Sequence, residues 1–365
     1  MNMRPADSFL TDLCASIPPA DAATAAATRQ RLDSLTKPRG SLGQLEALII
    51  RLAASTAQVC PCLDQRAVLL CAADHGVAAE GVSAYPQTVT GQMVQNFLAG
   101  GAAINVLAQT AGARIILVDA GVAADLPEHP HLQRLHIRRG SGNIAHEPAL
   151  SHDETLAAVQ AGAALVAAEA AHGLDILLTG EMGIANTTPA AALTSALVDA
   201  PPAQTVGRGT GIDAPTLAHK QQVVGRALAR VMGSASRWAG DPLHLLAELG
   251  GLEIATLTGA ILAAAARRIP ILLDGYITTS AALVAAALAP NVRVHLFASH
   301  QSAEPGHALA LAALGLTAEA GAGPLLRLDL RLGEGSGAAL ALPLLVAATR
   351  LLHDMATFEQ AGVDQ

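Results

Sequence analysis

Short apolar runs alternate with long alanine-rich stretches through most of this chain, and polar or glycine residues follow almost every run. The runs have the length and the Leu, Ile and Val content of buried strands. Strands that alternate with helices form a parallel sheet with helices on both faces. The sequence therefore predicts a Rossmann-like α/β fold with a parallel sheet of about six strands, at residues 67–71, 115–118, 175–178, 269–273, 292–297 and 326–330.

The expected helices divide the chain into two parts. Those between the strands occupy residues 87–110, 152–172, 215–232, 253–267, 277–289 and 335–354. Residues 5–63 are also helical in character, with a break rich in Pro and Gly at 32–43. We expect a small helical subdomain at 1–65, which the C-terminal helix can join, and an α/β domain that carries the chemistry at 66–350. Open parallel sheets bind ligands at the carboxyl ends of their strands, so we expect the site there.

The composition excludes several classes of protein. Although 52% of the residues are hydrophobic, the charge-free run at 275–292 contains Thr, Ser, Pro and Asn residues. It does not provide the roughly 20 predominantly apolar residues of a membrane span. Asp7 and Asp12 interrupt the first residues, which lack the apolar segment of a signal peptide. A formal net charge of −8 argues against a nucleic-acid partner. We expect a cytoplasmic protein without a membrane contact.

Metal-binding patterns are weak. The chain has four cysteines, Cys14, Cys60, Cys62 and Cys71. A zinc site needs about four ligands, and the pair at 60 and 62 has no second pair to complete it. The Pro-containing loop with His129, His131 and His136 also lacks a metal-ligand spacing. We expect reduced thiols, surface histidines and no metal.

Two glycine-rich segments suit a phosphate group. Residues 179–189 follow a predicted strand and open a helix, and exposed amides at a helix start bind anions. Residues 206–213 precede a helix that carries Lys220, without matching a Walker or dinucleotide-binding motif. The alternatives are a well-capped turn for the first segment and a flexible connector for the second. Two such loops in one chain favour a phosphosugar or a nucleotide.

Glu334 stands between Gly333 and Gly335, after the last predicted strand. Its neighbours offer no obvious salt-bridge partner, and an apolar pocket there would raise the pKa of the carboxyl and make it a useful base. The alternative is a glutamate in the first turn of the helix at 335–354, stabilised by the helix dipole. The residues alone do not decide between these two interpretations.

Five segments in order along the chain, taken together, resemble the nicotinate-nucleotide:dimethylbenzimidazole phosphoribosyltransferase family. They are residues 36–43, 73–86, 180–188, 207–211 and 332–337. The resemblance runs from about Leu32 to the C-terminal helix. One departure is Ala185, at a position where the family motif usually has Gly, and it restricts the turn.

The resemblance implies a reaction and a set of site residues. Phosphoribose moves from nicotinate mononucleotide to 5,6-dimethylbenzimidazole, which releases nicotinate and gives α-ribazole 5′-phosphate for the nucleotide loop of cobalamin. Glu334 is then the catalytic base, with no cofactor and no metal, in a homodimer. The phosphoribose would contact Gly180, Glu181, Gly183, Asn186, Thr187, Gly209, Lys220 and Ser299, and the acceptor base Ser83, Tyr85 and Gln92.

Two rival interpretations remain open. A catalytically silent homologue would retain the nucleotide pocket, although the presence of Glu334 speaks against it. A nicotinamide-dependent dehydrogenase would need Gly-x-Gly-x-x-Gly after its first strand, where this chain has residues 73–76, Ala-Asp-His-Gly. The acceptor also stays open among benzimidazoles, purines and phenolic bases.

Overall fold

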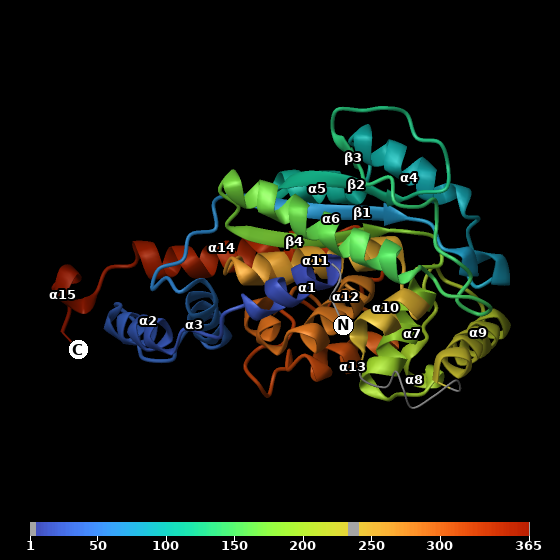
Figure 1. The fold of residues 1–365 in the computed structure, drawn as a ribbon. Coiled ribbons are helices and arrows are strands. Elements are labelled where there is room, and N and C mark those ends of the chain that lie inside the picture. Colours follow the sequence, from blue (N-terminus) through green and yellow to red (C-terminus); the bar gives the residue numbers. More distant parts are fainter. Residues whose placement is uncertain (1–4, 233–240, 365) are drawn as a thin grey trace.

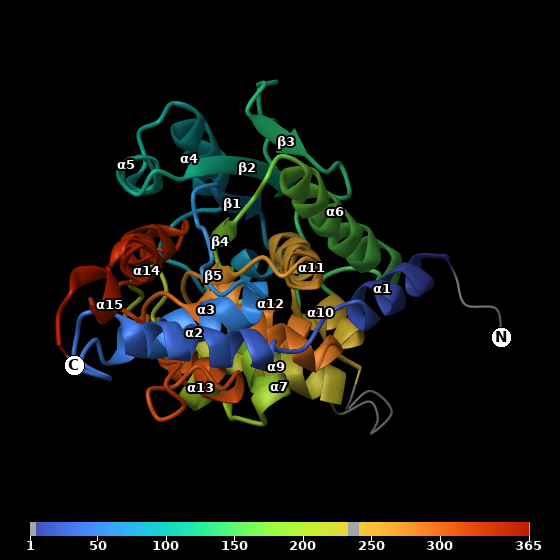
Figure 2. The ribbon, with the colours of Figure 1, turned by 90° about the vertical axis from the view of Figure 1, so that its left-hand side faces the viewer.

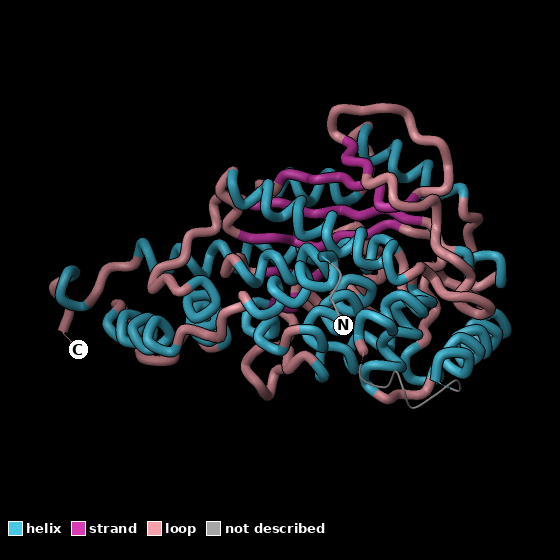
Figure 3. Tube along the Cα trace, in the orientation of Figure 1, coloured by secondary structure: helices cyan, strands magenta, loops and turns pink. Residues whose placement is uncertain are grey.

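Six parallel strands form the central layer of the protein, which a computed structural model describes over residues 5–232 and 241–364 (Figures 1 and 3). They are β1 (Arg66–Ala73), β2 (Arg114–Gly121), β3 (Leu132–Arg134), β4 (Ile176–Met182), β5 (Ile271–Leu273) and β6 (Leu296–Ala298). Their order across the sheet is β3-β2-β1-β4-β5-β6, and each neighbouring pair is parallel. The predicted Rossmann-like α/β fold is confirmed.

One predicted strand is wrong and another was missed. Residues 326–330 form a single bridge, between Leu326 and His300, and no strand. Charged Arg327 and Asp329 are exposed, and Asp329 has a φ of 53°, which interrupts extended backbone. The sixth strand is β3, whose three residues pair with β2 at the edge of the sheet. A segment this short carries too few apolar residues to be recognised as a strand.

Helices cover both faces of the sheet. Successive side chains of a strand point to opposite faces, and here the apolar side chains on each face are buried against helices. In β1, Leu69 and Cys71 belong to one hydrophobic core, and Val68 and Leu70 belong to the other. The first core contains α6 (His152–Ala171), α7 (Thr187–Val198), α10 (Pro242–Leu249), α11 (Leu252–Ala266) and α12 (Tyr276–Leu288). The second contains α3 (Gln44–Thr56), α4 (Thr88–Leu98), α5 (Ala103–Thr110) and α14 (Ser336–Asp354). Figure 2 shows α14 and α5 on one side of the strands and α6 and α11 on the other.

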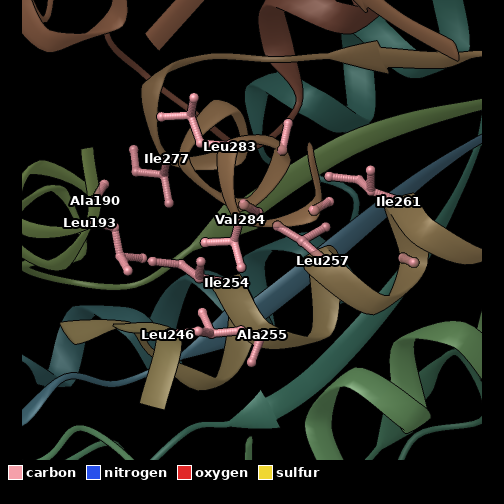
Figure 4. Packing of buried hydrophobic residues seen from close by; sticks show 14 of the residues in the cluster. Ala190, Leu193, Leu246, Ile254, Ala255, Leu257, Ile261, Ile277, Leu283 and Val284 are labelled. Atoms are coloured by element: carbon pink, nitrogen blue, oxygen red, sulfur yellow. The ribbon is translucent and has the colours of Figure 1, made fainter. Parts of the chain in front are cut away.

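The first core owes its density to small residues. A side chain at Gly162 of α6 would collide with the backbone of Thr256, and one at Gly259 of α11 would collide with the backbone of Val159. The two helices therefore approach to backbone contact. Around them, Ile254 and Leu257 of α11 lie beside apolar side chains of α7, α10 and α12 (Figure 4).

The N-terminal helices do not all lie in one place. Helix α1 (Pro5–Ala15) contacts α6 and α11, whereas α2 (Ala22–Ser34) and α3 contact each other and α3 also contacts α14. Near the C-terminus, α15 (Phe358–Ala361) follows a bridge between Leu35 and Thr357. The predicted subdomain boundary at residue 65 stays a prediction.

The predicted helix at 87–110 is two helices, because Gly100, with a φ of 79°, separates α4 from α5. The other helical segments are η1 (Gly76–Glu80), α8 (Pro202–Thr205), α9 (Ala214–Met232), η2 (Pro290–His295) and α13 (Pro305–Ala313). Within the described residues, α14 alone has the length and composition to cross a membrane. More than half of it is buried inside the protein, as expected for a core helix.

Candidate active site

A cavity of about 530 Å³ opens at the carboxyl edge of the sheet. The ends of β4, β5 and β6 meet there, and the loops before α7 and α14 complete its walls. Eight of the twelve predicted site residues line it: Ser83, Tyr85, Glu181, Gly183, Asn186, Thr187, Gly209 and Glu334. The edge of the sheet is where the strand pattern predicted a ligand site.

Glu334 is held in an unusual way in the cavity wall. Its φ of 66° lies in the left-handed region, which costs a residue with a side chain free energy. It precedes α14 by two residues and is only 5% exposed. Its Oε2 atom has no hydrogen-bond partner among the described residues. Burial raises the pKa of the Glu334 carboxyl above its usual value, and the Ile104 backbone partly opposes this rise.

Gly180 does not line the cavity, but it allows the Glu334 loop to approach the sheet. A side chain at Gly180 would come within 2.7 Å of the Glu334 carbonyl oxygen. The amide of Glu334 also donates to the Glu181 carbonyl oxygen, at 3.2 Å. The last residues of β4 therefore fix the loop that carries Glu334.

Asp274, directly after β5, anchors the other side of this loop. Its Oδ1 accepts hydrogen bonds from the amides of Gly337 (2.7 Å) and Ala338 (3.1 Å), and its Oδ2 from Gly335 (3.2 Å). The carboxylate thus occupies the N-terminus of α14, where it interacts favourably with the helix dipole. Burial nevertheless raises the pKa of Asp274 to about 7, against the effect of these amides.

Glu181 adds a third buried carboxyl. Its side chain accepts a hydrogen bond from the Asn186 amide, so these two predicted residues are in contact. Burial raises the pKa of Glu181 well above its usual value, and the charges of Asp274, Glu253 and Glu334 add to the effect. Two carboxyl groups that line the cavity, those of Glu181 and Glu334, therefore bind protons more tightly than usual.

The predicted phosphate loops meet at the other end of the cavity. The Lys220 ammonium, 1% exposed, donates to Thr187 Oγ1 at 2.6 Å and to the Gly207 carbonyl oxygen at 3.4 Å. Burial lowers the pKa of Lys220 to about 8, and the charge of Glu304 partly opposes this. The loop at 206–213 and the start of α7 are thus joined through one buried cation, although Lys220 does not itself line the cavity.

The residues predicted for the acceptor base separate in the structure. Ser83 and Tyr85 line the cavity, whereas Gln92 is exposed on α4 and does not. Thr210 ties their segment to the phosphate loop: its Oγ1 accepts a hydrogen bond from the Ala84 amide at 3.0 Å and lies 3.2 Å from Ser83 Oγ. The predicted residue Ser299 is buried behind the wall, where its Oγ donates to the Asp274 carbonyl oxygen.

Several residues of this edge were not predicted. Asp274, Glu304 and Arg331 form hydrogen bonds with loop backbone, and His75 Nε2 lies 2.6 Å from Glu253 Oε1 in a buried hydrogen bond. The sequence did contain one signal, since Asp274 and His75 each follow a strand. Glu304 and Arg331 carried none, because their partners lie more than ninety residues away in the chain.

Two other positions that the sequence singled out, Ala185 and the histidine loop at 129–136, lie as follows. Ala185 has a φ of 74°, so the turn does take the shape that Gly adopts more easily. The rings of His129 and His131 lie in tilted contact, with 5.4 Å between their centroids. No cluster of three His, Cys, Asp or Glu residues suited to a metal occurs in the described part of the chain.

Comparison with known proteins places the chain among relatives of similar length. Residues 17–363 match a family model described as phosphoribosyltransferase. Proteins from Deinococcus radiodurans and Chloroflexus aggregans, both named nicotinate-nucleotide–dimethylbenzimidazole phosphoribosyltransferase, are 52% and 50% identical. The alignments cover 98% of this chain in both cases, and 96% and 99% of the relatives.

Solved structures agree with this placement. The crystal structure of CobT from Thermus thermophilus superposes with a TM-score of 0.88 at 49% sequence identity. The match covers 94% of this chain and 99% of that one. A second structure from the same organism, titled as a nicotinate-nucleotide–dimethylbenzimidazole phosphoribosyltransferase, gives a TM-score of 0.87 at 48% identity.

Proposed function

The chain belongs to the phosphoribosyltransferase family, and from this premise we propose that it transfers phosphoribose from nicotinate mononucleotide to 5,6-dimethylbenzimidazole. The products are nicotinate and α-ribazole 5′-phosphate, the nucleotide of the cobalamin lower ligand. The observation that carries the mechanism is the buried Glu334 carboxyl, with an unpartnered oxygen and a raised pKa in the cavity wall.

The reaction needs one proton acceptor. One nitrogen of the benzimidazole attacks C1′ of the ribose, and the bond from C1′ to the pyridinium nitrogen breaks. The bonding electrons neutralise the pyridinium ring, so nicotinate leaves without needing an acid. The attack inverts the anomeric carbon from β to α. The other benzimidazole nitrogen gives its proton to Glu334, which a raised pKa makes a stronger base.

We place the donor phosphate where the two glycine-rich loops meet. Lys220 supplies the charge there, the Thr187 hydroxyl and the amide region of Gly183 supply hydrogen-bond donors, and Gly209 borders the phosphate without donating its amide, which is bound to Glu304. Glu181, held by Asn186, faces the ribose. Gly180 and Ser299 support the walls from behind rather than by contact with the ligand.

We place the acceptor base beside Ser83 and Tyr85. The apolar side chains of Val82, Val89 and Met93 line this part of the cavity and suit the methyl groups of dimethylbenzimidazole. Gln92 is exposed on α4, outside the cavity lining, and its contact with the acceptor base stays a prediction. Tyr85 is 56% exposed, so the mouth is open for the base to enter.

The location and the assembly of the protein are also proposals. We place the enzyme in the cytoplasm, as a homodimer that uses neither cofactor nor metal. Val106 of α5 and Leu344 of α14 are exposed at 59% and 39%, on two helices that contact each other. Their apolar side chains fit a subunit interface.

The function is tested by incubating the protein with nicotinate mononucleotide and a panel of benzimidazoles, purines and phenolic bases. Products are identified by mass. We expect a phosphoribosylated benzimidazole and an equal amount of nicotinate. The transferase function is wrong if no base yields a phosphoribosyl product.

A further inference from the structure

Glu304 is a buried carboxylate at the phosphate end of the cavity, 6% exposed, to which the proposed mechanism gives no role. It is the residue before α13, a position from which a side chain often caps its own helix. This side chain makes no such hydrogen bond. Instead, its Oε1 accepts a hydrogen bond from the Gly209 amide at 2.7 Å, across ninety-five positions of the chain.

The second oxygen of this carboxylate is aimed at the same loop. Oε2 is buried and has no hydrogen-bond partner among the described residues. A side chain at Gly207 would collide with it, so Gly207 lets the loop pass directly over the carboxylate. A side chain at Gly209 would lie 3.2 Å from Lys220 Nζ. The loop therefore runs between the Glu304 carboxylate and the Lys220 ammonium.

Lys220 needs a counter-charge in this position. Its two hydrogen-bond acceptors, Thr187 Oγ1 and the Gly207 carbonyl oxygen, are uncharged. An ammonium that is 1% exposed is costly to keep charged with neutral partners alone. Glu304 is the group whose charge acts on Lys220 in the opposite direction to burial.

The carbonyl group of Gly209, in the next peptide group, is also held. Arg331, from the segment that leads to Glu334, donates to the Gly209 carbonyl oxygen at 2.9 Å. Glu304 and Arg331 thus bind the amide and the carbonyl oxygen of Gly209, whose φ is 49°. A turn fixed at both ends presents its neighbours to a ligand without reorganisation.

We propose that Glu304 is a positioning residue of the donor-phosphate site, where it fixes the Gly209 turn and provides the counter-charge of Lys220. This proposal rests on the proposed function, because the ligand in question is the phosphate of nicotinate mononucleotide. Glu304 acts through Lys220 and Gly209 and takes no part in proton transfer to Glu334.

The test uses Glu304→Gln, which keeps the shape and an oxygen acceptor for Gly209 but removes the charge. The KM for nicotinate mononucleotide and kcat are measured from pH 6 to pH 9.5. In the wild type, KM should rise as pH passes about 8, where Lys220 loses its proton. In the variant the rise should begin about one pH unit lower, giving roughly fivefold higher KM at pH 8 and approaching about tenfold above pH 9. Near pH 6, both KM and kcat should stay within about twofold of the wild type.

A matched control separates charge at this site from charge elsewhere. Glu128 is exposed and distant in sequence from both loops, and Glu128→Gln should reproduce the wild-type pH profile. Gly207→Ala displaces the Glu304 carboxylate without removing it, and should move the rise of KM in the same direction as Glu304→Gln. It serves as the test if Glu304→Gln does not fold.

The proposal is overturned if KM of Glu304→Gln rises at the same pH as KM of the wild type. It is also overturned if kcat and KM of this variant change equally at every pH. Titration calorimetry with inorganic phosphate makes the test independent of turnover. If the wild type shows no transferase activity, phosphate binding should still weaken at lower pH in Glu304→Gln than in the wild type. An identical pH dependence of phosphate binding would then refute the role of Glu304.

Discussion

The α6–α11 helix pair and the carboxyl edge of the sheet are both buried, but they are built from different groups. At the helix pair, Gly162 and Gly259 bring two backbones into contact, and apolar side chains surround them. At the carboxyl edge, buried side-chain oxygens and nitrogens lack hydrogen-bond partners. Among the described residues these atoms are Asp74 Oδ1, His75 Nδ1, Thr188 Oγ1, Glu253 Oε2, Glu304 Oε2, Glu334 Oε2 and Ser336 Oγ.

Each of these atoms belongs to a residue just after a strand, just before a helix or in the first turn of a helix. Among the described residues of the α6–α11 pair, only Glu253, in the first turn of α11, has such an atom. A buried polar group without a partner costs about 1–3 kcal/mol of folding free energy. The helix pair therefore stabilises the fold. The edge lowers the free energy of unfolding, because its buried polar groups remain without partners and available to a ligand. Substitutions at the two regions should have opposite effects on turnover and on stability.

The largest effect should come from Glu334→Gln. Loss of a general base lowers turnover by a factor on the order of 10³. The fold should not be weakened at pH 8, because the substitution removes a buried charge that lacks a full set of partners. Initial rates of nicotinate release and thermal unfolding measure the two effects. A variant that keeps turnover within tenfold of the wild type would show that Glu334 is not the base.

The same variant has a defined pH signature in its stability. The folded-state pKa of Glu334 lies above the unfolded value, so the folded protein holds this proton more tightly. The contribution of Glu334 to stability is therefore present at low pH and is lost as pH rises through the folded-state pKa. Glu334→Gln should remove this loss, so the difference in unfolding free energy should favour the variant increasingly with pH.

Gly259→Ala should lower the stability of the fold and leave substrate binding by the folded protein unchanged. A methyl group at Gly259 collides with the Val159 backbone, which cannot give way as a side chain can. Overpacking of this kind costs about 1–3 kcal/mol of unfolding free energy. The folded fraction should keep the wild-type KM for nicotinate mononucleotide, since α6 and α11 pack away from the cavity lining at this point.

Gly225→Ala is the matched control for this substitution. Gly225 also lies inside a helix, α9, but a methyl group there meets no atom within 4 Å. Ala exceeds Gly in helix propensity by about 1 kcal/mol, so this variant should be slightly more stable than the wild type. Equal losses of stability in both variants, measured by denaturant unfolding, would contradict close packing at α6–α11.

Thr210→Val should have a smaller effect, confined to the edge. The substitution preserves shape but removes the hydroxyl that links the phosphate loop to Ala84 and Ser83. Two exposed hydrogen bonds are worth about 1 kcal/mol together, so KM for the acceptor base should rise by about fivefold. KM for nicotinate mononucleotide should change less. An unchanged KM for the acceptor base would show that this link does not position the Ser83 segment.

The smallest effect should come from Ala185→Gly. Ala185 is strained by its φ of 74°, and Gly adopts this conformation without the penalty. The unfolding free energy should rise by roughly 1 kcal/mol, although Gly is usually the less stable choice. A fall in thermal stability would mean that the turn at Ala185 is not strained. The destabilisation of the edge would then come from its unpartnered polar groups alone.

Sequence reasoning located the edge because it depends on local patterns. Runs of apolar residues followed by Gly, Thr or Glu predicted where β4 ends and why Glu181, Gly183 and Thr187 come together. It does not specify side-chain placements that depend on contacts between distant segments. Gln92 faces solvent and Ser299 lies behind the wall, and neither orientation is encoded in the neighbouring residues.

The same limit explains the residues that were missed. Asp274 follows a strand like several other polar residues, but its role depends on α14, which begins more than sixty positions later. Glu304 looks like an ordinary helix-start glutamate, and its partner is the Gly209 amide. The segment at 326–330 has the leucine content of a buried strand, but the charges of Arg327 and Asp329 prevent its burial on both faces.

The central claim is that burial without a full set of partners makes Glu334 a stronger base than an ordinary glutamate. The most direct measurement is an NMR titration of the protein labelled with carbon-13 at the glutamate carboxyl groups. The Glu334 signal is assigned by its loss in Glu334→Gln. We expect its pKa to lie above the usual value of about 4.5. A pKa at or below that value would contradict the claim.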